Sequence, residues 1–173
     1  MAFNQKKKVL FLLNQLRAGT GPFQRAIRLD DESFDITILS CYDTTEEVTS
    51  IARLLHPDFG RRKIIGLGIR GKLKLAWTLM CYIFRHKPDI IQTSHTFSTV
   101  VAVFARHLFR HGVVVNFEGT LFTLMKPIQR YFLQLLLSFA DGTICVSNAV
   151  EETNRFSSRL FRHSPVRRVI YNG

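Results

Sequence analysis

The sequence predicts an α/β protein with a Rossmann-like, mainly parallel sheet of seven strands and helices on both faces. The chain has 173 residues, of which 46% are hydrophobic and 15 are phenylalanine, enough for the core of one domain. Short apolar runs alternate with segments of helical spacing, which is typical of βαβ units. Runs such as VLFLL and VVV are continuously apolar, as strands buried on both faces of a parallel sheet are.

The alternation predicts the position of each strand and helix. Strands are predicted at Val9–Leu13, Ile36–Leu39, Lys63–Ile65, Asp89–Gln92, Val113–Phe117, Thr143–Val146 and Arg168–Tyr171. Helices are predicted at Pro22–Leu29, Thr45–Leu55, Gly71–Arg85, Ser98–Phe109, Leu124–Ser138 and Asn148–Phe156. Pro22 suits a first helical turn, Pro88 follows a helix end, and Ser147 can cap the next helix. Residues 1–173 are therefore expected to form a single domain.

The charge of the chain is strongly unbalanced. Lysine and arginine number 24 against 13 acids, for a net charge of +11. Between Phe59 and Phe117 there are ten basic residues and one acid. A segregated basic surface indicates an anionic partner, either nucleic acid or lipid head groups. The sequence contains no aromatic RNA-binding motif and no recognition helix of a known type, which favours a membrane surface over nucleic acid.

The lengths of the apolar segments indicate where the protein is located. The first apolar run has five residues, too few for a signal peptide, and no run approaches the roughly 20 residues that span a bilayer. Cys41, Cys81 and Cys145 lie within apolar runs and are expected to be buried free thiols of a reducing compartment. We therefore expect a cytoplasmic protein that contacts the inner face of the membrane only peripherally.

The segment from Gly71 to Lys87 is the candidate for that contact. It is apolar in its middle and basic at both ends, as interfacial helices are, with Trp77 and Phe84 directed to the lipid. A helix packed against a sheet also has an apolar middle, so burial is the alternative.

The loop after the first strand is the first candidate site. Glycines let a ligand approach the backbone, and free N–H groups at a helix start favour anions. Gly19, Thr20 and Gly21 resemble part of a dinucleotide fingerprint, with Asp43 in place of its ribose-binding acid. Five residues separate the strand from the first glycine, and Gln24 replaces the third, so a classical NAD site is disfavoured. An ordinary flexible loop is the alternative.

His95 and Glu118 form the second candidate site. Each follows a predicted strand at its carboxyl end, where open α/β sheets bind ligands. If those strands are neighbours, both side chains and the glycine loop converge on one cleft. Taken singly, a surface or helix-capping histidine and a solvated loop carboxylate are the alternatives. His107 and His111 have helical spacing but no carboxylate beside them, so a basic face is expected there and no metal site.

Five segments in this order resemble the N-terminal half of the GT-B glycosyltransferases of family 4. They are Lys6–Asn14 with the loop Gly19–Gly21, Lys87–His95, Val113–Gly119, Ala140–Asn148 and Val169–Gly173. Two departures stand out. The loop keeps only Arg25 from the family's acid–arginine pair, and Glu118 stands where the family often has a histidine.

The resemblance implies the acceptor-binding half of a sugar-nucleotide-dependent glycosyltransferase. The nucleotide sugar would be a co-substrate, without a further cofactor or metal, and the acceptor a lipid-linked or membrane-borne glycan. By the resemblance, His95 and Glu118 would be catalytic, Gly19, Thr20 and Gly21 would face the donor phosphates, and Ser147 and Asn148 would line the cleft. The family's donor-binding domain is absent from residues 1–173, so this chain alone is expected to be inactive.

Two alternatives belong to other classes. One is a non-catalytic, membrane-docking subunit of a split glycosyltransferase. The other, less favoured, is a basic nucleic-acid-binding α/β module.

Overall fold

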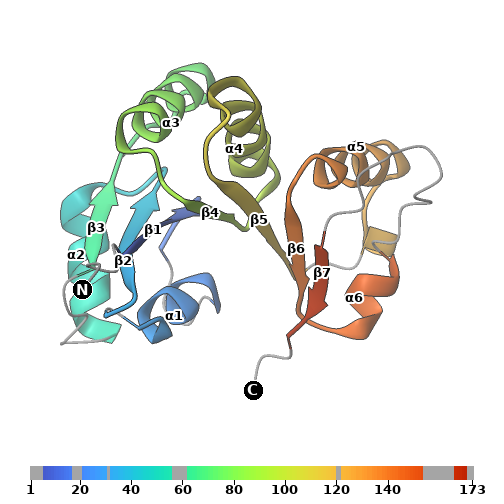
Figure 1. The fold of residues 1–173 in the computed structure, drawn as a ribbon, viewed down its shortest axis with the longest axis horizontal. Coiled ribbons are helices and arrows are strands. Elements are labelled where there is room, and N and C mark those ends of the chain that lie inside the picture. Colours follow the sequence, from blue (N-terminus) through green and yellow to red (C-terminus); the bar gives the residue numbers. More distant parts are fainter. Residues whose placement is uncertain are drawn as a thin grey trace, which may run out of the picture.

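A computed structural model describes residues 6–16, 21–30, 32–55, 62–119, 122–153 and 166–170. Its strands form one seven-stranded sheet in the order β3-β2-β1-β4-β5-β6-β7, and every neighbouring pair is parallel (Figure 1). The strands are β1 (Lys7–Leu13), β2 (Phe34–Ser40), β3 (Lys63–Gly66), β4 (Ile90–Thr93), β5 (Val113–Glu118), β6 (Gly142–Cys145) and β7 (Val166–Val169). The predicted fold class and all seven predicted strands are confirmed.

Helices cover both faces of this sheet. They are α1 (Gly21–Arg28), α2 (Thr45–Leu55), α3 (Lys72–His86), α4 (Thr96–Phe109), α5 (Pro127–Ser138) and α6 (Asn148–Thr153), with a short 3-10 turn η1 at Phe122–Leu124. Helices α3, α4 and α5 lie on one face, and α1, α2 and α6 lie on the other (Figure 1). We call these the α4 face and the α1 face.

Most element boundaries differ from the predicted ones by one to three residues, and the predicted ends at Phe156 and Tyr171 lie outside the described residues. Two of the differences have a visible cause. The helix expected from Leu124 begins at Pro127, because a proline fits the first helical position and the residues before it form η1. The last strand begins at Val166 rather than Arg168. The Val166 amide donates to the Asp141 carbonyl at 3.2 Å, which starts the pairing with β6 two residues earlier than the apolar pattern indicated.

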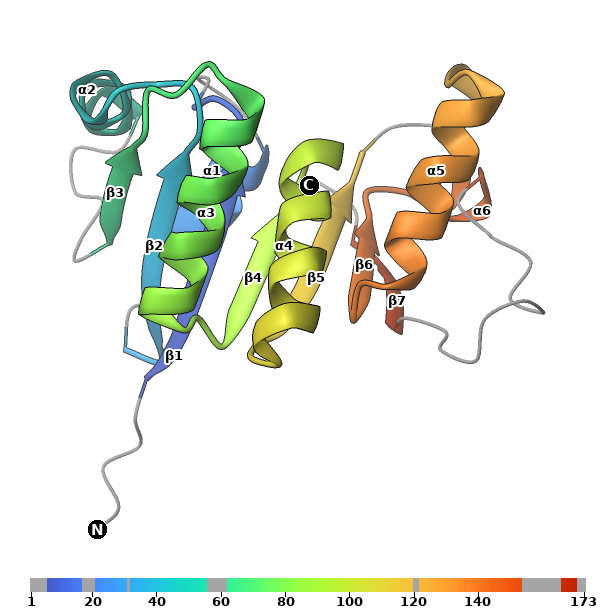
Figure 2. The ribbon, with the colours of Figure 1, turned by 90° about the horizontal axis from the view of Figure 1, so that it is seen from above.

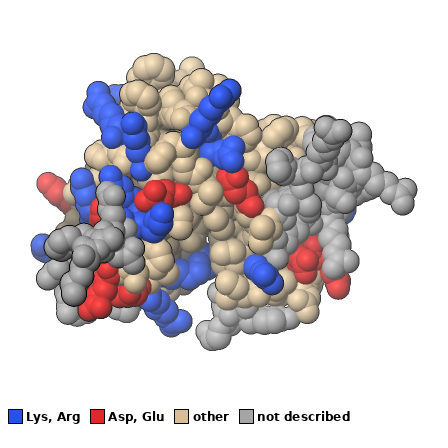
Figure 3. Space-filling model, viewed as in Figure 1, with Lys and Arg blue, Asp and Glu red and all other residues tan. Residues whose placement is uncertain are grey.

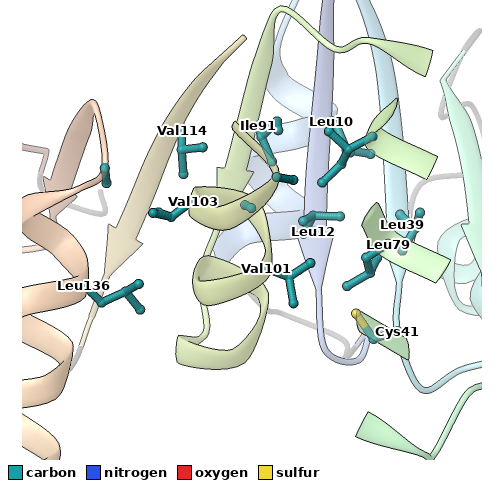
Figure 4. Close-up of a cluster of buried hydrophobic side chains, with 14 of the residues drawn as sticks. Leu10, Leu12, Leu39, Cys41, Leu79, Ile91, Val101, Val103, Val114 and Leu136 are labelled. Carbon is teal, nitrogen blue, oxygen red and sulfur yellow. The ribbon is translucent and has the colours of Figure 1, made fainter. Parts of the chain in front are cut away.

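The core consists of two apolar layers separated by the sheet. Alternate residues of β1 point to opposite sides: Leu10 and Leu12 belong to the layer on the α4 face, and Phe11 and Leu13 to the layer on the α1 face. Figure 4 shows the first layer, with Leu79 of α3 and Val101 of α4 packed over the strands. The expectation that the central strands are buried on both sides is confirmed.

The three thiols are free, as expected, although their burial differs. Cys41 and Cys145 are buried, whereas Cys81 is half-buried. Burial raises the pKa of the Cys41 thiol to about 12, and the nearby Asp43 carboxylate adds to the effect. Cys41 is therefore a protonated core residue at neutral pH.

Two aspartates fix the register of the central strands. Each precedes a strand and accepts a hydrogen bond from the second residue of the neighbouring strand. Asp89 accepts from the Lys8 amide of β1 at 2.8 Å, and Asp141 accepts from the Val114 amide of β5 at 2.8 Å. Asp141 also forms a two-point ion pair with Arg106 of α4, with N–O distances of 2.8 and 3.1 Å. These two aspartates of the family-like motifs are thus structural.

Replacing Asp141 by alanine should lower the free energy of unfolding by about 1.5–3 kcal/mol, the usual range for hydrogen bonds to a charged group. The change removes an ion pair and leaves the Val114 amide without its acceptor. Urea denaturation followed by circular dichroism measures the effect. Glu152→Ala on the exposed side of α6 is the matched control. Equal stability of both variants would contradict a structural role for Asp141.

Candidate active site at the carboxyl edge of the sheet

The order of the strands marks one edge of the sheet as the expected place for a ligand. β1 pairs with β2 on one side and with β4 on the other, so the direction in which the chain adds strands reverses at β1. Helices that follow β1 and β4 cover opposite faces, and open α/β sheets bind ligands at such a reversal, beyond the carboxyl ends of the strands. In Figure 2 these ends lie at the upper edge, where α3, α4 and α5 begin.

His95 and Glu118 lie at this edge on adjacent strands. β4 and β5 are neighbours, which confirms the predicted adjacency, and Thr93 pairs with Asn116. His95 and Glu118 each follow that pair by two residues, so both lie at the carboxyl edge of these neighbouring strands. His95 is exposed at the start of α4, whereas Glu118 is the last residue of β5 and is only 8% exposed. Glu118 is therefore a buried strand residue and not the solvated loop carboxylate of the alternative interpretation.

A buried polar network supports the backbone of His95. The Thr99 hydroxyl lies 2.8 Å from the Thr93 hydroxyl, 3.0 Å from Asn116 Oδ1 and 2.9 Å from the His95 carbonyl oxygen. Thr93, Thr99 and Asn116 are buried between β4, β5 and α4. Hydrogen-bonded groups inside a core hold a defined geometry, so the network fixes where α4 begins and where His95 stands.

The environment of His95 favours its neutral form. Desolvation by surrounding protein atoms lowers the pKa of the imidazole below its ordinary value. A neutral imidazole near pH 7 has a free nitrogen lone pair, which can accept a hydrogen bond or a proton from a substrate hydroxyl.

Four further polar side chains near this edge were not predicted as site residues. Within the described part of the chain, buried atoms of each have no hydrogen-bond partner: Asn14 Oδ1, the three guanidinium nitrogens of Arg25, Gln92 Nε2 and Ser94 Oγ. Asn14 follows β1, Gln92 belongs to β4, Ser94 follows β4, and Arg25 lies on α1. Buried polar groups without partners are uncommon in folded proteins. One signal was visible in the sequence: Gln92 and Ser94 interrupt an apolar strand end.

The charged side chain of Arg25 packs against an aromatic ring. Its guanidinium carbon lies 3.1 Å from the centroid of the Phe117 ring of β5, a close cation–π contact. Burial lowers the pKa of Arg25 to about 10, so the side chain still carries its charge at neutral pH. A charged group is thus held at the carboxyl edge with an aromatic face as its described contact.

The other predicted site residues have mixed outcomes. Gly21 is the first residue of α1, whereas Gly19 and Thr20 lie outside the described residues. Ser147 accepts a hydrogen bond from the Val150 amide at 3.3 Å, which confirms it as the cap of α6, and Asn148 is exposed beside it.

Asp43 is engaged within the fold and does not resemble a ribose-binding acid. Its Oδ2 accepts from the Leu16 amide and from the Ser40 hydroxyl, both at 2.6 Å. These bonds tie the end of β1 to the end of β2. The side chain therefore shapes the connection that leads into α1.

His107 of α4 and His111, which follows the end of that helix, have structural contacts. His107 Nδ1 lies 2.9 Å from the Val103 carbonyl oxygen, and His111 Nε2 lies 2.9 Å from the Lys87 carbonyl oxygen. Within the described part of the chain, no group of three or more His, Cys, Asp or Glu side chains is placed to hold a metal ion.

The His95 imidazole should titrate below the same imidazole in the unfolded chain, because folding desolvates its charged form. Proton NMR of the native protein and of the protein in concentrated urea gives both midpoints. The neutral form is favoured by folding, so this contribution to stability is present above the unfolded pKa and is lost as the pH falls through the folded one. A native midpoint at or above the unfolded one would contradict this environment.

Three solved structures share this fold. HepE of Anabaena, solved with UDP and glucose, has a TM-score of 0.67 and 17% identity, covering 96% of this chain and 44% of its own. The lipopolysaccharide outer core galactosyltransferase WaaB has a TM-score of 0.62 and 13% identity, with coverages of 95% and 45%. MurG of Acinetobacter baumannii has a TM-score of 0.58 and 16% identity, with coverages of 96% and 46%. The chain spans less than half the length of each.

The family comparison covers most of the sequence. No curated protein matches the chain significantly. The family model of Glycosyltransferase Family 4 matches residues 24–173, which include β2 to β7 and both candidate residues His95 and Glu118. The chain therefore belongs to Glycosyltransferase Family 4 and has the fold of the N-terminal domain of a GT-B enzyme.

Proposed function

We propose that this domain is the acceptor-binding half of a sugar-nucleotide-dependent glycosyltransferase. The observation that carries the proposal is the set of polar groups from β1, α1, β4 and β5 that gathers at the carboxyl edge where the sheet reverses. Membership of the family gives the reaction class, and the edge gives this domain a place to hold one substrate.

His95 and Glu118 are the proposed catalytic residues. The neutral imidazole of His95 is suited to accept a proton or hydrogen bond from an attacking hydroxyl, and the Glu118 carboxylate is suited to orient sugar hydroxyls. Gly19, Thr20 and Gly21 would let the donor phosphates approach the backbone at the start of α1. Ser147 and Asn148, at the start of α6, would line the same cleft.

The donor is proposed to be a nucleotide sugar held mainly by a second, C-terminal domain. HepE was solved in complex with UDP and glucose, and WaaB is a galactosyltransferase of the lipopolysaccharide outer core. The first supports a nucleotide-sugar donor, and the second supports a lipid-borne acceptor. Residues 1–173 then form one domain that supplies the acceptor wall of the cleft.

Peripheral contact with an anionic membrane is the second part of the proposal. Leu75, Leu79 and Ile83 of α3 are buried against the sheet, but Leu73 and Trp77 on its outer side are 89% and 70% exposed. Phe84 of α3 and Phe104 and Leu108 of α4 extend this apolar surface, each more than half exposed. Apolar residues at this density on an outer surface mark an interaction site.

Positive charge surrounds the same helices. Lysine and arginine side chains are spread over the upper surface in Figure 3, where α3 and α4 lie. Beyond the ends of these helices, a pocket of about 300 Å³ at the amino edge of the sheet is lined by Lys6, Lys7, Lys8, Lys87, Asp89 and His111. None of the described helices is both long and apolar enough to cross a membrane. The exposed apolar residues and their basic surroundings therefore favour interfacial docking at the inner face of the membrane.

The acceptor-binding role is tested by comparing ligands on the isolated domain. Saturation-transfer NMR should detect binding of glycolipid acceptors in neutral detergent and only weak binding of nucleotide sugars. His95→Ala should weaken acceptor binding several-fold and change the free energy of unfolding by no more than about 0.5 kcal/mol, as for an exposed site. Transfer itself should require an added donor-binding domain. Strong nucleotide-sugar binding without acceptor binding, or turnover by the domain alone, would contradict the proposal.

Membrane docking is tested by sedimentation with phosphatidylglycerol vesicles at increasing salt. Binding should fall steeply as salt screens the basic surface, since the screening length is about 10 Å at 0.1 M. Lys72→Gln with Lys74→Gln should weaken it by about 1 kcal/mol per charge. Arg28→Gln with Arg53→Gln, at the ends of α1 and α2 on the other face, is the matched control. Tight binding to duplex DNA without vesicle binding would favour the nucleic-acid alternative.

A further inference from the structure

Three side chains with unpaired hydrogen-bond donors lie near the ends of β4 and β5. Gln92 pairs in register with Val115, and alternation along β5 places Phe117 on the same face of the sheet, whereas Ser94 follows the end of β4 by one residue. Arg25 approaches from α1 and lies over the Phe117 ring. Among the described residues, the guanidinium, the Gln92 amide nitrogen and the Ser94 hydroxyl have no hydrogen-bond partner.

The unpaired groups of this cluster can all donate hydrogen bonds. A guanidinium has five N–H groups in a planar fork that can bind two oxygens of a phosphate or a carboxylate, and an amide and a hydroxyl add donors in other directions. Glu118 lies on the opposite face of the sheet, since it follows Phe117 directly along β5. A buried cation without a counter-charge is costly, and retaining one is typical of a site whose partner comes from a ligand.

The Phe117 ring explains how the charge is held in place. Its face attracts the guanidinium without using any of its N–H groups, so all five remain without an acceptor among the described residues. An ion pair in the same position would occupy some of these N–H groups, as the pair of Arg106 with Asp141 does.

From these contacts we infer that Arg25, Gln92 and Ser94 form an oxyanion site that holds a phosphate group of a substrate against the acceptor half. This inference rests on the proposed function, because it places the site inside the substrate cleft. The phosphate belongs either to the nucleotide-sugar donor or to a lipid-phosphate acceptor, which share this chemistry. The donors have almost no contact with solvent in this conformation, so the phosphate reaches them after the atoms above them shift.

The site is tested first with inorganic pyrophosphate on the isolated domain. The Arg25 side-chain Nε resonance should shift in heteronuclear NMR, and pyrophosphate should raise the melting temperature. Arg25→Met should abolish this stabilisation and leave the melting temperature without ligand unchanged or higher, because a buried unpaired charge is removed. Arg28→Met on the exposed side of the same helix is the matched control and should keep the full effect.

Two further variants keep the test decisive if Arg25→Met does not fold. Gln92→Met and Ser94→Ala should each weaken pyrophosphate binding several-fold. Pyrophosphate stabilisation that survives in all folded variants, or that is lost equally in Arg28→Met, would overturn the site.

The source of the phosphate is separated by comparing UDP with a short-chain polyprenyl phosphate in neutral detergent. The ligand that binds with the larger loss on substitution of Arg25, Gln92 or Ser94 identifies the substrate. These measurements need no transfer reaction. The oxyanion site is therefore tested separately from glycosyl transfer by a two-domain protein.

Discussion

The parallel pairing of β1 with β4 joins the two halves of the sheet and sets the position of everything at its carboxyl edge. β1 and β4 lie side by side at that edge, and the chain adds its further strands on opposite sides of this pair. Asp89 supports this pairing, because its carboxylate holds the Lys8 amide at the start of β1. At the other end of the same strands, Asn14 Oδ1, Gln92 Nε2 and Ser94 Oγ have no hydrogen-bond partner among the described residues. One pairing therefore determines both the stability of the centre and the position of the crevice.

Paired and unpaired polar groups are divided between the two edges of the sheet. At the amino edge, Asp89 and Asp141 accept hydrogen bonds from backbone amides, and Asp141 also pairs with Arg106. At the carboxyl edge, Arg25 is stacked on Phe117 and has no hydrogen-bond partner among the described residues. The aspartates are therefore used by the fold itself, whereas the unpaired donors at the carboxyl edge are the groups on which the proposed substrate site depends.

Most of the fold could be predicted from the sequence, because continuous apolar runs and helical spacing alternate along the chain. The pairing of β4 with β5 followed from that order. The structural use of Asp43 could not be predicted, since its contact with Leu16 depends on how two connections meet in space. The role of Arg25 escaped prediction for the same reason, because its contact with Phe117 joins residues from distant parts of the chain. The exposure of Trp77 could not be predicted either, because α3 has apolar residues on both sides and only packing decides which are buried.

If this domain holds an acceptor, it should do so at the carboxyl edge where the chain reverses between β1 and β4. Hydrogen–deuterium exchange with and without a bound glycolipid acceptor can decide this, because the method locates protection along the whole backbone. We predict protection of amides near residues 14–16, 94–97 and 118–119, with little change at the amino edge around residues 6–8 and 87–89. Protection confined to the amino edge, with the carboxyl ends of β1, β4 and β5 unchanged, would contradict this placement of the acceptor.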